Sequence, residues 1–133
     1  LIPSILSSVL SGNATLKIFG DDYPTVDGTC VRDYVHVTDL AQAHLLALER
    51  MQIKKGFSAY NLGNGNGFSV FDIIRSCERA ANTEISYQIE KRRNGDRAIL
   101  VADSELALSS LNWNPKYKNI DDIVKSAWLW HSR

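Results

Sequence analysis

Apolar side chains recur at intervals of three and four residues in several parts of the chain, which predicts amphipathic helices. The clearest stripe follows Ser69, a good N-cap residue, and consists of Val70, Ile73, Ile74, Cys77 and Ala81. A second helix is expected from an N-cap at Thr38 to about Met51, with an apolar face formed by Leu40, His44, Ala47, Leu48 and Met51.

Three more helices are expected from shorter patterns. Pro3 and Gly12 bracket a short helix over residues 3–11. Asp103 is a suitable cap for a helix that ends near Leu111. The last helix is marked by Ile120, Ile123, Val124, Ala127 and Trp130.

Runs rich in β-branched and aromatic residues predict short strands between these helices. Such runs occupy residues 16–19, 31–37, 58–62 and 85–89, and the first two are separated by the turn-rich loop GDDYPTVDGT. Strands this short, interspersed with helices, predict a small mixed α/β fold that is too irregular for a complete doubly wound sheet.

Composition narrows the class of protein. The 133 residues are enough for one domain, and the 15 basic side chains are balanced by 15 acidic ones, so we expect neither nucleic acid nor a membrane as a partner. No apolar run approaches the length of a membrane-spanning helix. Cys30 and Cys77 have neither CxxC spacing nor a disulfide framework, which favours the cytoplasm.

A glycine-rich turn lies in the segment YNLGNGNGFSVFD, between a predicted strand and a predicted helix. Its glycines follow the pattern G-x-G-x-G, whereas a dinucleotide-binding turn requires G-x-G-x-x-G, and Phe68 occupies the place of the third glycine. We interpret the segment as a tight connection, although the N-terminus of the following helix could still face an anion.

Other residues that suggest chemistry have simpler interpretations. Tyr87 and Lys91 form a Y-x-x-x-K pair, but four residues along a strand span about 13 Å, too far for the lysine to lower the pKa of the phenol. Asp21, Asp22 and Asp27 lack metal-ligand spacing, so no metal site is expected. Two histidines, His36 and His44, are interpreted as structural.

Several segments together resemble the UDP-glucose 4-epimerases (UDP-galactose 4-epimerases), which are extended short-chain dehydrogenases. The most specific is LKIFGDDYPTVDGTCVRDYVHV at residues 16–37; the others are residues 39–44, 60–63, 92–96 and 111–113. They follow family order and cover nearly the whole chain. The resemblance implies that residues 1–133 are a C-terminal UDP-sugar-binding domain that lacks the N-terminal Rossmann domain. The start at Leu1, in the middle of a pattern, agrees with a fragment.

The resemblance also implies a set of substrate-binding residues. Arg32 and Arg93 match the arginines on the UDP diphosphate, and Asp96 matches the carboxylate on the uridine ribose. An ion pair between Arg32 and Asp33 is the alternative for the first arginine. Guanidinium groups suit phosphates because their planar array of donors matches phosphate oxygens.

The remaining candidates surround these three. Lys17, Ile18 and Phe19 match a segment that brackets the uracil, mainly through backbone and phenyl contacts. Val70 matches an apolar nucleotide contact but fits a helix core equally well. Leu1 follows the position of a sugar-nucleotide contact, and Leu100 matches a position at the sugar end, where bulk decides whether N-acetylated sugars enter.

The whole enzyme implied by this resemblance inverts C4 of the hexose in UDP-glucose and UDP-galactose. NAD and the catalytic Tyr/Lys pair are expected in a domain upstream of Leu1, through which the full protein forms a homodimer, and residues 1–133 alone are expected to be inactive. Two alternatives stay open: the substrate domain of a nucleotide-sugar decarboxylase or dehydratase, and a non-catalytic binding module.

Overall fold

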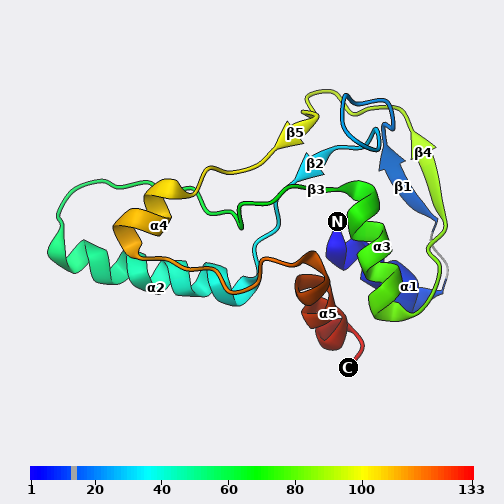
Figure 1. Cartoon of the computed structure of the whole chain (residues 1–133). Helices are drawn as coiled ribbons and strands as arrows, with labels where there is room; N and C mark the ends of the chain where they lie inside the picture. The colour runs from blue at the N-terminus through cyan, green and yellow to red at the C-terminus, as the bar shows by residue number, and fades with distance from the viewer. Residues whose placement is uncertain (13–14) are drawn as a thin grey trace.

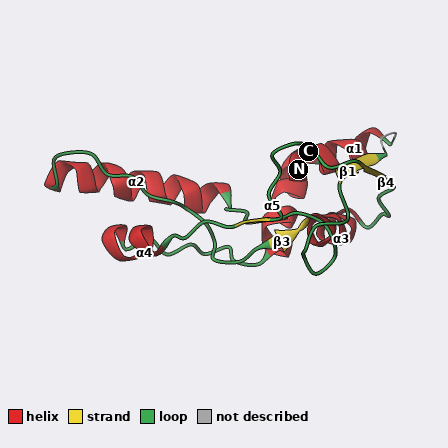
Figure 2. Cartoon of the chain, turned by 90° about the horizontal axis from the view of Figure 1, so that it is seen from above, coloured by secondary structure: helices red, strands yellow, loops and turns green. Residues whose placement is uncertain are grey.

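The computed structural model describes residues 1–12 and 15–133. Two groups of helices lie at opposite ends of an elongated molecule and are joined by short strands (Figures 1 and 2). The elements in chain order are α1 (Ile2–Ser11), β1 (Leu16–Phe19), β2 (Val31–Arg32), α2 (Val37–Ile53), β3 (Phe68–Ser69), α3 (Val70–Ala81), β4 (Tyr87–Glu90), β5 (Ile99–Leu100), α4 (Glu105–Leu111) and α5 (Ile120–His131).

The strands form two small sheets, as expected for a mixed α/β fold. Strand β1 pairs in parallel with β4, with Phe19 opposite Glu90. Strand β2 lies between β3, which is antiparallel to it, and β5, which is parallel to it, with Arg32 opposite Leu100. The two sheets bring the segments after β1 and β4 close to the middle strand β2 (Figure 1).

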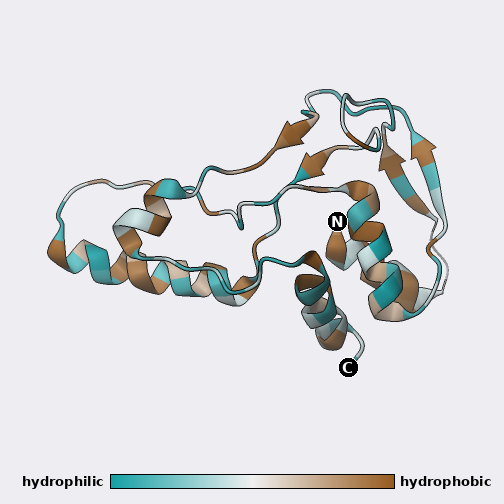
Figure 3. Cartoon of the chain, in the orientation of Figure 1, coloured by the Kyte–Doolittle hydropathy of each residue, from teal (hydrophilic) through white to brown (hydrophobic). Residues whose placement is uncertain are grey.

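The larger core lies where α3 packs against α1 and α5. The stripe predicted on α3 faces this core, because Ile73, Ile74 and Cys77 are buried there in one cluster with apolar residues of α1 and α5. Figure 3 shows hydrophobic residues along these three neighbouring helices. Ser69 caps α3 as expected: its hydroxyl accepts from the Asp72 N–H at 3.0 Å, and the Asp72 carboxylate accepts from the Ser69 N–H. This capping box fixes where α3 begins.

Burial of the Cys77 thiol predicts alkaline destabilisation. Desolvation raises its pKa from 9.0 to about 12, so above pH 9 the unfolded chain loses this proton before the folded chain does. The stability that the protonated thiol contributes is complete below pH 9 and should decline above it by on the order of 1 kcal/mol per pH unit. Urea unfolding of wild type and Cys77→Ala at pH 8 to 10.5 measures this; equal pH slopes for both proteins would contradict the prediction.

The smaller core joins α2 to α4 around the indole of Trp113. Trp113 is buried with Ala43, Ala107 and Leu111, and its ring N–H donates to the Asp39 carbonyl at 2.9 Å. Trp113 is thus a packing anchor of this core, whereas Trp130, which belongs to the pattern that predicts α5, is exposed.

Two details of α2 differ from prediction. The helix starts earlier, at Val37, because the His36 side chain, not Thr38, is the cap and accepts from the Thr38 N–H. Its predicted apolar face is also wrong, because most of those side chains are exposed. The buried residues of the helix are Asp39 and Ala43, and Ala43 packs against α4. The helix is apolar on two sides, which a single stripe does not reveal. Its exposed apolar side chains are Val37, Leu40, Leu45, Leu48, Met51 and Ile53.

The strand predicted at residues 58–62 is not formed. Within the described residues this segment has no ladder partner, although Tyr60 and Leu62 still pack against the smaller core. The strand predicted over residues 31–37 is also shortened to two residues, because the chain turns into α2. No helix in the described part of the chain is both long and apolar enough to cross a membrane.

Candidate nucleotide-binding site

Arg32, Arg93 and Asp96 form one charged cluster, although 61 positions separate the two arginines in the sequence. Arg32 is in β2, while Arg93 and Asp96 lie on the connection from β4 to β5. The Asp96 carboxylate lies 3.8 Å from Nη2 of Arg32 and 3.0 Å from Nε of Arg93. The fold therefore places the two guanidinium groups on one shared acid.

The alternative partner proposed for Arg32 is directed elsewhere. Successive side chains of an extended segment point to opposite faces, and the Asp33 carboxylate accepts from the Ala102 N–H at 3.1 Å. Arg32 instead donates to its neighbouring Val31 carbonyl and approaches Asp96. The ion pair between Arg32 and Asp33 is not formed.

An aromatic and an aliphatic side chain adjoin the cluster. The guanidinium carbon of Arg93 lies 4.7 Å from the centre of the Phe19 ring, a cation–π contact at the end of β1. Leu100 is the register partner of Arg32 and is 56% exposed. Apolar side chains therefore adjoin both arginines: Phe19 lies against Arg93, and Leu100 lies on the strand beside Arg32.

The other expected site residues have structural contacts of their own. Lys17 forms an ion pair with Glu90 at 3.2 Å, and Ile18 is buried in the larger core. The Val70 N–H donates to the Thr29 hydroxyl, while its side chain packs on that core. The Leu1 carbonyl accepts from Ile5 within α1. Among the described residues, none of these four side chains bonds to the charged cluster.

The loop between β1 and β2 is fastened to the start of α3 by the DGT segment. Asp27 accepts from the Thr29 hydroxyl at 2.7 Å, from the Thr29 N–H at 3.0 Å and from the Ser69 hydroxyl. Together with Asp72, these groups occupy the N-terminus of α3. The anion that could have faced this helix end is thus replaced by the protein's own carboxylates.

The glycine turn is shaped around the protein's own side chains. A Cβ on Gly63 would lie 2.3 Å from the Asp33 carboxylate, and one on Gly67 would lie 2.6 Å from the Val31 side chain. These two glycines are required by contacts inside the fold. Because Phe68 also replaces the third glycine, the turn does not match a dinucleotide-binding turn.

The residues interpreted as structural have the contacts expected of that role. Tyr87 lies in β4 and packs edge-on against Phe71, so it and Lys91 do not share a helical face. His36 contacts Ser126 at 2.8 Å and stacks on Tyr117 at a centroid distance of 3.9 Å. The described residues contain no cluster of three or more potential metal ligands.

Two contacts near the cluster were not anticipated. Arg92 bonds Asp22, and the guanidinium of Arg92 lies 4.1 Å from the centre of the Tyr23 ring. The sequence contains a clue, since an acidic loop and a basic loop each follow one of the paired strands β1 and β4. Charge order alone, however, does not reveal that Arg92 and Arg93 face different partners.

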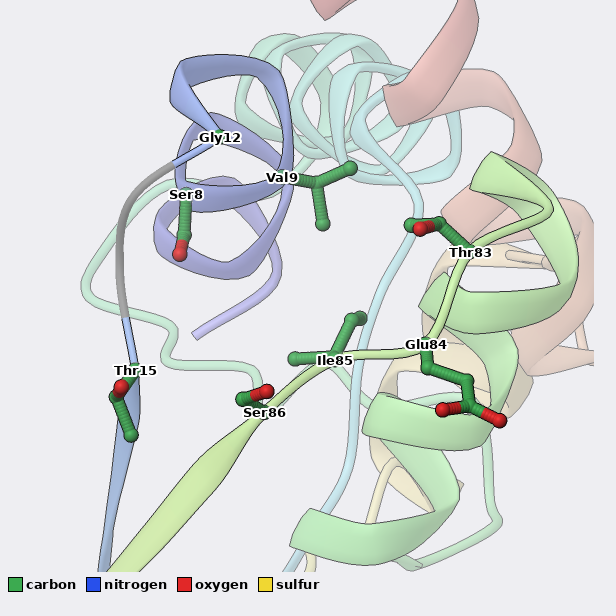
Figure 4. Close-up of a pocket in the computed structure, with 8 residues that line it drawn as sticks. All are labelled: Ser8, Val9, Gly12, Thr15, Thr83, Glu84, Ile85 and Ser86. Carbon is green, nitrogen blue, oxygen red and sulfur yellow. The ribbon is translucent and has the colours of Figure 1, made fainter.

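A cavity of about 400 Å³ lies elsewhere, between α1 and the segment that leads into β4 (Figure 4). Its lining includes Ser8, Thr15, Thr83, Glu84 and Ser86, and no residue of the charged cluster. It has no basic group to attract a phosphate, so the arginine cluster is the stronger candidate site.

Comparison with known proteins agrees with this fold. The family described as "NAD dependent epimerase/dehydratase family" matches residues 1–63. These residues are similar to this family. Within it, the chain is similar to UDP-glucose 4-epimerases: it is 47% identical to the enzyme of Lactobacillus helveticus over 131 residues, 98% of this chain and 40% of that protein.

Solved structures show the same likeness. A UDP-glucose 4-epimerase crystal structure aligns with a TM-score of 0.93 and 47% identity, covering 99% of this chain and 40% of the other. The epimerase of Bifidobacterium longum, solved with NAD⁺ and UDP, aligns with a TM-score of 0.92 and 39% identity, covering 99% and 39%. The chain thus spans about 40% of the length of these relatives.

One expectation about the cofactor is overturned. The family whose description specifies NAD matches residues 1–63 of this chain itself, and the chain aligns with a structure that holds NAD⁺. These findings contradict the prediction that NAD belongs to a domain missing from the chain.

Proposed function

We propose that residues 1–133 form the UDP-binding unit of a UDP-glucose 4-epimerase. The observation that carries this proposal is the meeting of Arg32 and Arg93 on Asp96. It is supported by similarity to UDP-glucose 4-epimerases over nearly the whole chain. The full-length protein would interconvert UDP-glucose and UDP-galactose.

The charges of the cluster suit a nucleoside diphosphate. Two guanidinium groups share one carboxylate, so one positive charge is left to attract an anion. Arginine offers several donors in one plane and can bind two phosphate oxygens at once. Asp96 keeps acceptor oxygens for ribose hydroxyls, and the Phe19 ring offers a surface beside the base.

The division between charged and apolar groups suits epimerisation at C4. The sugar must present both faces to the reacting centre, whereas the nucleotide has to stay in place. Strong charged contacts to UDP, combined with an apolar Leu100 at the sugar end, meet both needs.

In the full-length protein, the exposed apolar face of α2 would be covered by a preceding domain, and we propose a homodimer by analogy with the family. Both cysteines are free thiols, which fits a cytoplasmic protein.

Calorimetric titration with UDP, together with an NMR assay of UDP-galactose conversion to UDP-glucose, tests the proposal in the full-length protein. Binding of UDP and inversion at C4 are the expected results. Decarboxylation or dehydration of a nucleotide sugar instead would identify a different reaction on the same site. A protein that does not bind UDP at all would contradict the proposal.

Leu100 is expected to influence which sugars are accepted. Replacing it with tyrosine adds bulk beside the register partner Arg32, and should reduce turnover of UDP-N-acetylglucosamine about tenfold or more relative to UDP-glucose. The measurement is the ratio of kcat/KM for the two sugars, with Ile99→Tyr on the same strand as the control. An unchanged ratio would remove Leu100 from the sugar end of the site.

A further inference from the structure

Arg92 joins the two loops that lie beside the charged cluster. Its Nε donates to the Asp22 carboxylate at 2.6 Å, and its Nη2 donates to the Asp22 backbone carbonyl. The guanidinium carbon lies 4.1 Å from the centre of the Tyr23 ring. One side chain of the connection from β4 to β5 is therefore held at three points by the loop that follows β1.

The surface beneath Arg92 is fixed by packing. Tyr23 is only 6% exposed, and its N–H donates to the Gly28 carbonyl at 2.8 Å. Gly20 adopts φ +88°, and a Cβ at that position would lie 2.7 Å from the Arg92 side chain and equally close to the Tyr23 ring. The aliphatic part of Arg92 thus packs against the bare backbone of Gly20. Such close contact leaves the side chain little freedom to move.

Arg92 and Arg93 are adjacent in the sequence but bind different partners. The charge of Arg92 is matched by Asp22, whose pKa is lowered by the hydrogen bond from that guanidinium. Arg93, one residue later, has its side chain over Phe19 and bonds Asp96. Anchoring Arg92 on the loop after β1 thus fixes the backbone from which Arg93 reaches Phe19 and Asp96.

We propose that the pair formed by Asp22 and Arg92 is a positioning element for UDP binding. It holds the connection between β4 and β5 where Arg93 and Asp96 face Arg32, and it does so without contacting UDP. The inference rests on the proposed function, since it concerns the same cluster.

A double-mutant cycle in the full-length protein tests this role. Arg92→Met removes all three contacts, whereas Asp22→Asn removes the charge that Arg92 pairs with and keeps the backbone contact. UDP binding should weaken about threefold to tenfold for Arg92→Met and by a smaller factor for Asp22→Asn, because the affected groups are partly exposed. The double variant should bind UDP no more weakly than the weaker single variant. The KM for UDP-glucose should rise by the same factor, with little change in kcat.

A matched control is Arg79→Met. Arg79 forms an ion pair with Asp121 at 2.5 Å between α3 and α5, away from the cluster, so its loss should leave UDP affinity unchanged. Thermal unfolding of every variant shows whether the fold persists. If Arg92→Met does not fold, Asp22→Asn decides the question, because it changes only one carboxylate oxygen.

The outcomes distinguish a failure of the positioning role from a failure of the proposed UDP-binding function. A weaker complex for Arg92→Met with normal affinity for Asp22→Asn would mean that Arg92 contacts UDP itself, which overturns the positioning role. Normal affinity in both variants, with weak binding by Arg32→Ala, overturns the positioning role and leaves the proposed function intact. If wild type itself fails to bind UDP, both inferences are wrong.

Discussion

Replacing Arg32 by alanine is expected to raise the dissociation constant for UDP by roughly tenfold to a hundredfold. A charged hydrogen bond contributes about 1.5–3 kcal/mol, and each 1.4 kcal/mol is a factor of about ten in affinity. Arg32 is the more protected arginine of the cluster, with a side chain 27% exposed against 63% for Arg93. The loss should therefore be larger for Arg32 than for Arg93→Ala, and calorimetric titration of both variants measures the order.

The controls distinguish a binding contact from a general loss of charge. Arg79→Ala removes a guanidinium from α3 whose side chain is 57% exposed, close to the value for Arg93, and should leave the affinity for UDP unchanged. Asp96→Asn keeps one oxygen near both arginines but removes the negative charge of the shared acid. If Asp96 contacts the ribose, the affinity for UDP should change by a different factor than the affinity for inorganic diphosphate, which has no ribose. Equal affinity for UDP in wild type, Arg32→Ala and Arg93→Ala would exclude the cluster as a diphosphate site.

Local patterns predicted the elements whose contacts are close in sequence. The start of α3 depends on Ser69 and Asp72, three residues apart, and α1 is bounded by Pro3 and Gly12, so both helices were predicted within a residue or two. The cluster itself required the family resemblance. No periodicity indicates that a residue of β2 meets the connection between β4 and β5.

The failures occur where the deciding contact is distant or absent. His36 takes over the cap of α2 because its ring also contacts Ser126, 90 positions away. The segment at residues 58–62 has strand-forming side chains but no paired neighbour within the described chain, and backbone pairing is what makes a strand. The second apolar face of α2 was likewise invisible to a pattern that assumes a single buried stripe.

The buried carboxylate of Asp39 is expected to control the stability of the smaller core. Its two oxygens accept from the backbone N–H groups of Lys116 and Tyr117 at 3.0 and 2.9 Å, and the residue is 2% exposed. These bonds tie the start of α2 to the segment between α4 and α5. Asp39→Ala leaves two donors without a partner, so the free energy of unfolding should fall by about 3 kcal/mol or more.

Asp39→Asn sharpens this prediction, because asparagine has nearly the same shape. Its amide offers one oxygen and one NH₂ group, and the NH₂ would confront a backbone N–H that needs an acceptor. Urea unfolding should therefore show a substantial loss for Asp39→Asn as well. Asp103→Asn is the matched control, since Asp103 is an exposed acid whose single bond goes to the Glu105 N–H, and it should change stability by less than about 1 kcal/mol. If Asp39→Asn were as stable as wild type, one acceptor oxygen would be enough to join α2 to the segment before α5. The pair of hydrogen bonds to the Asp39 carboxylate would then not be what holds these elements together.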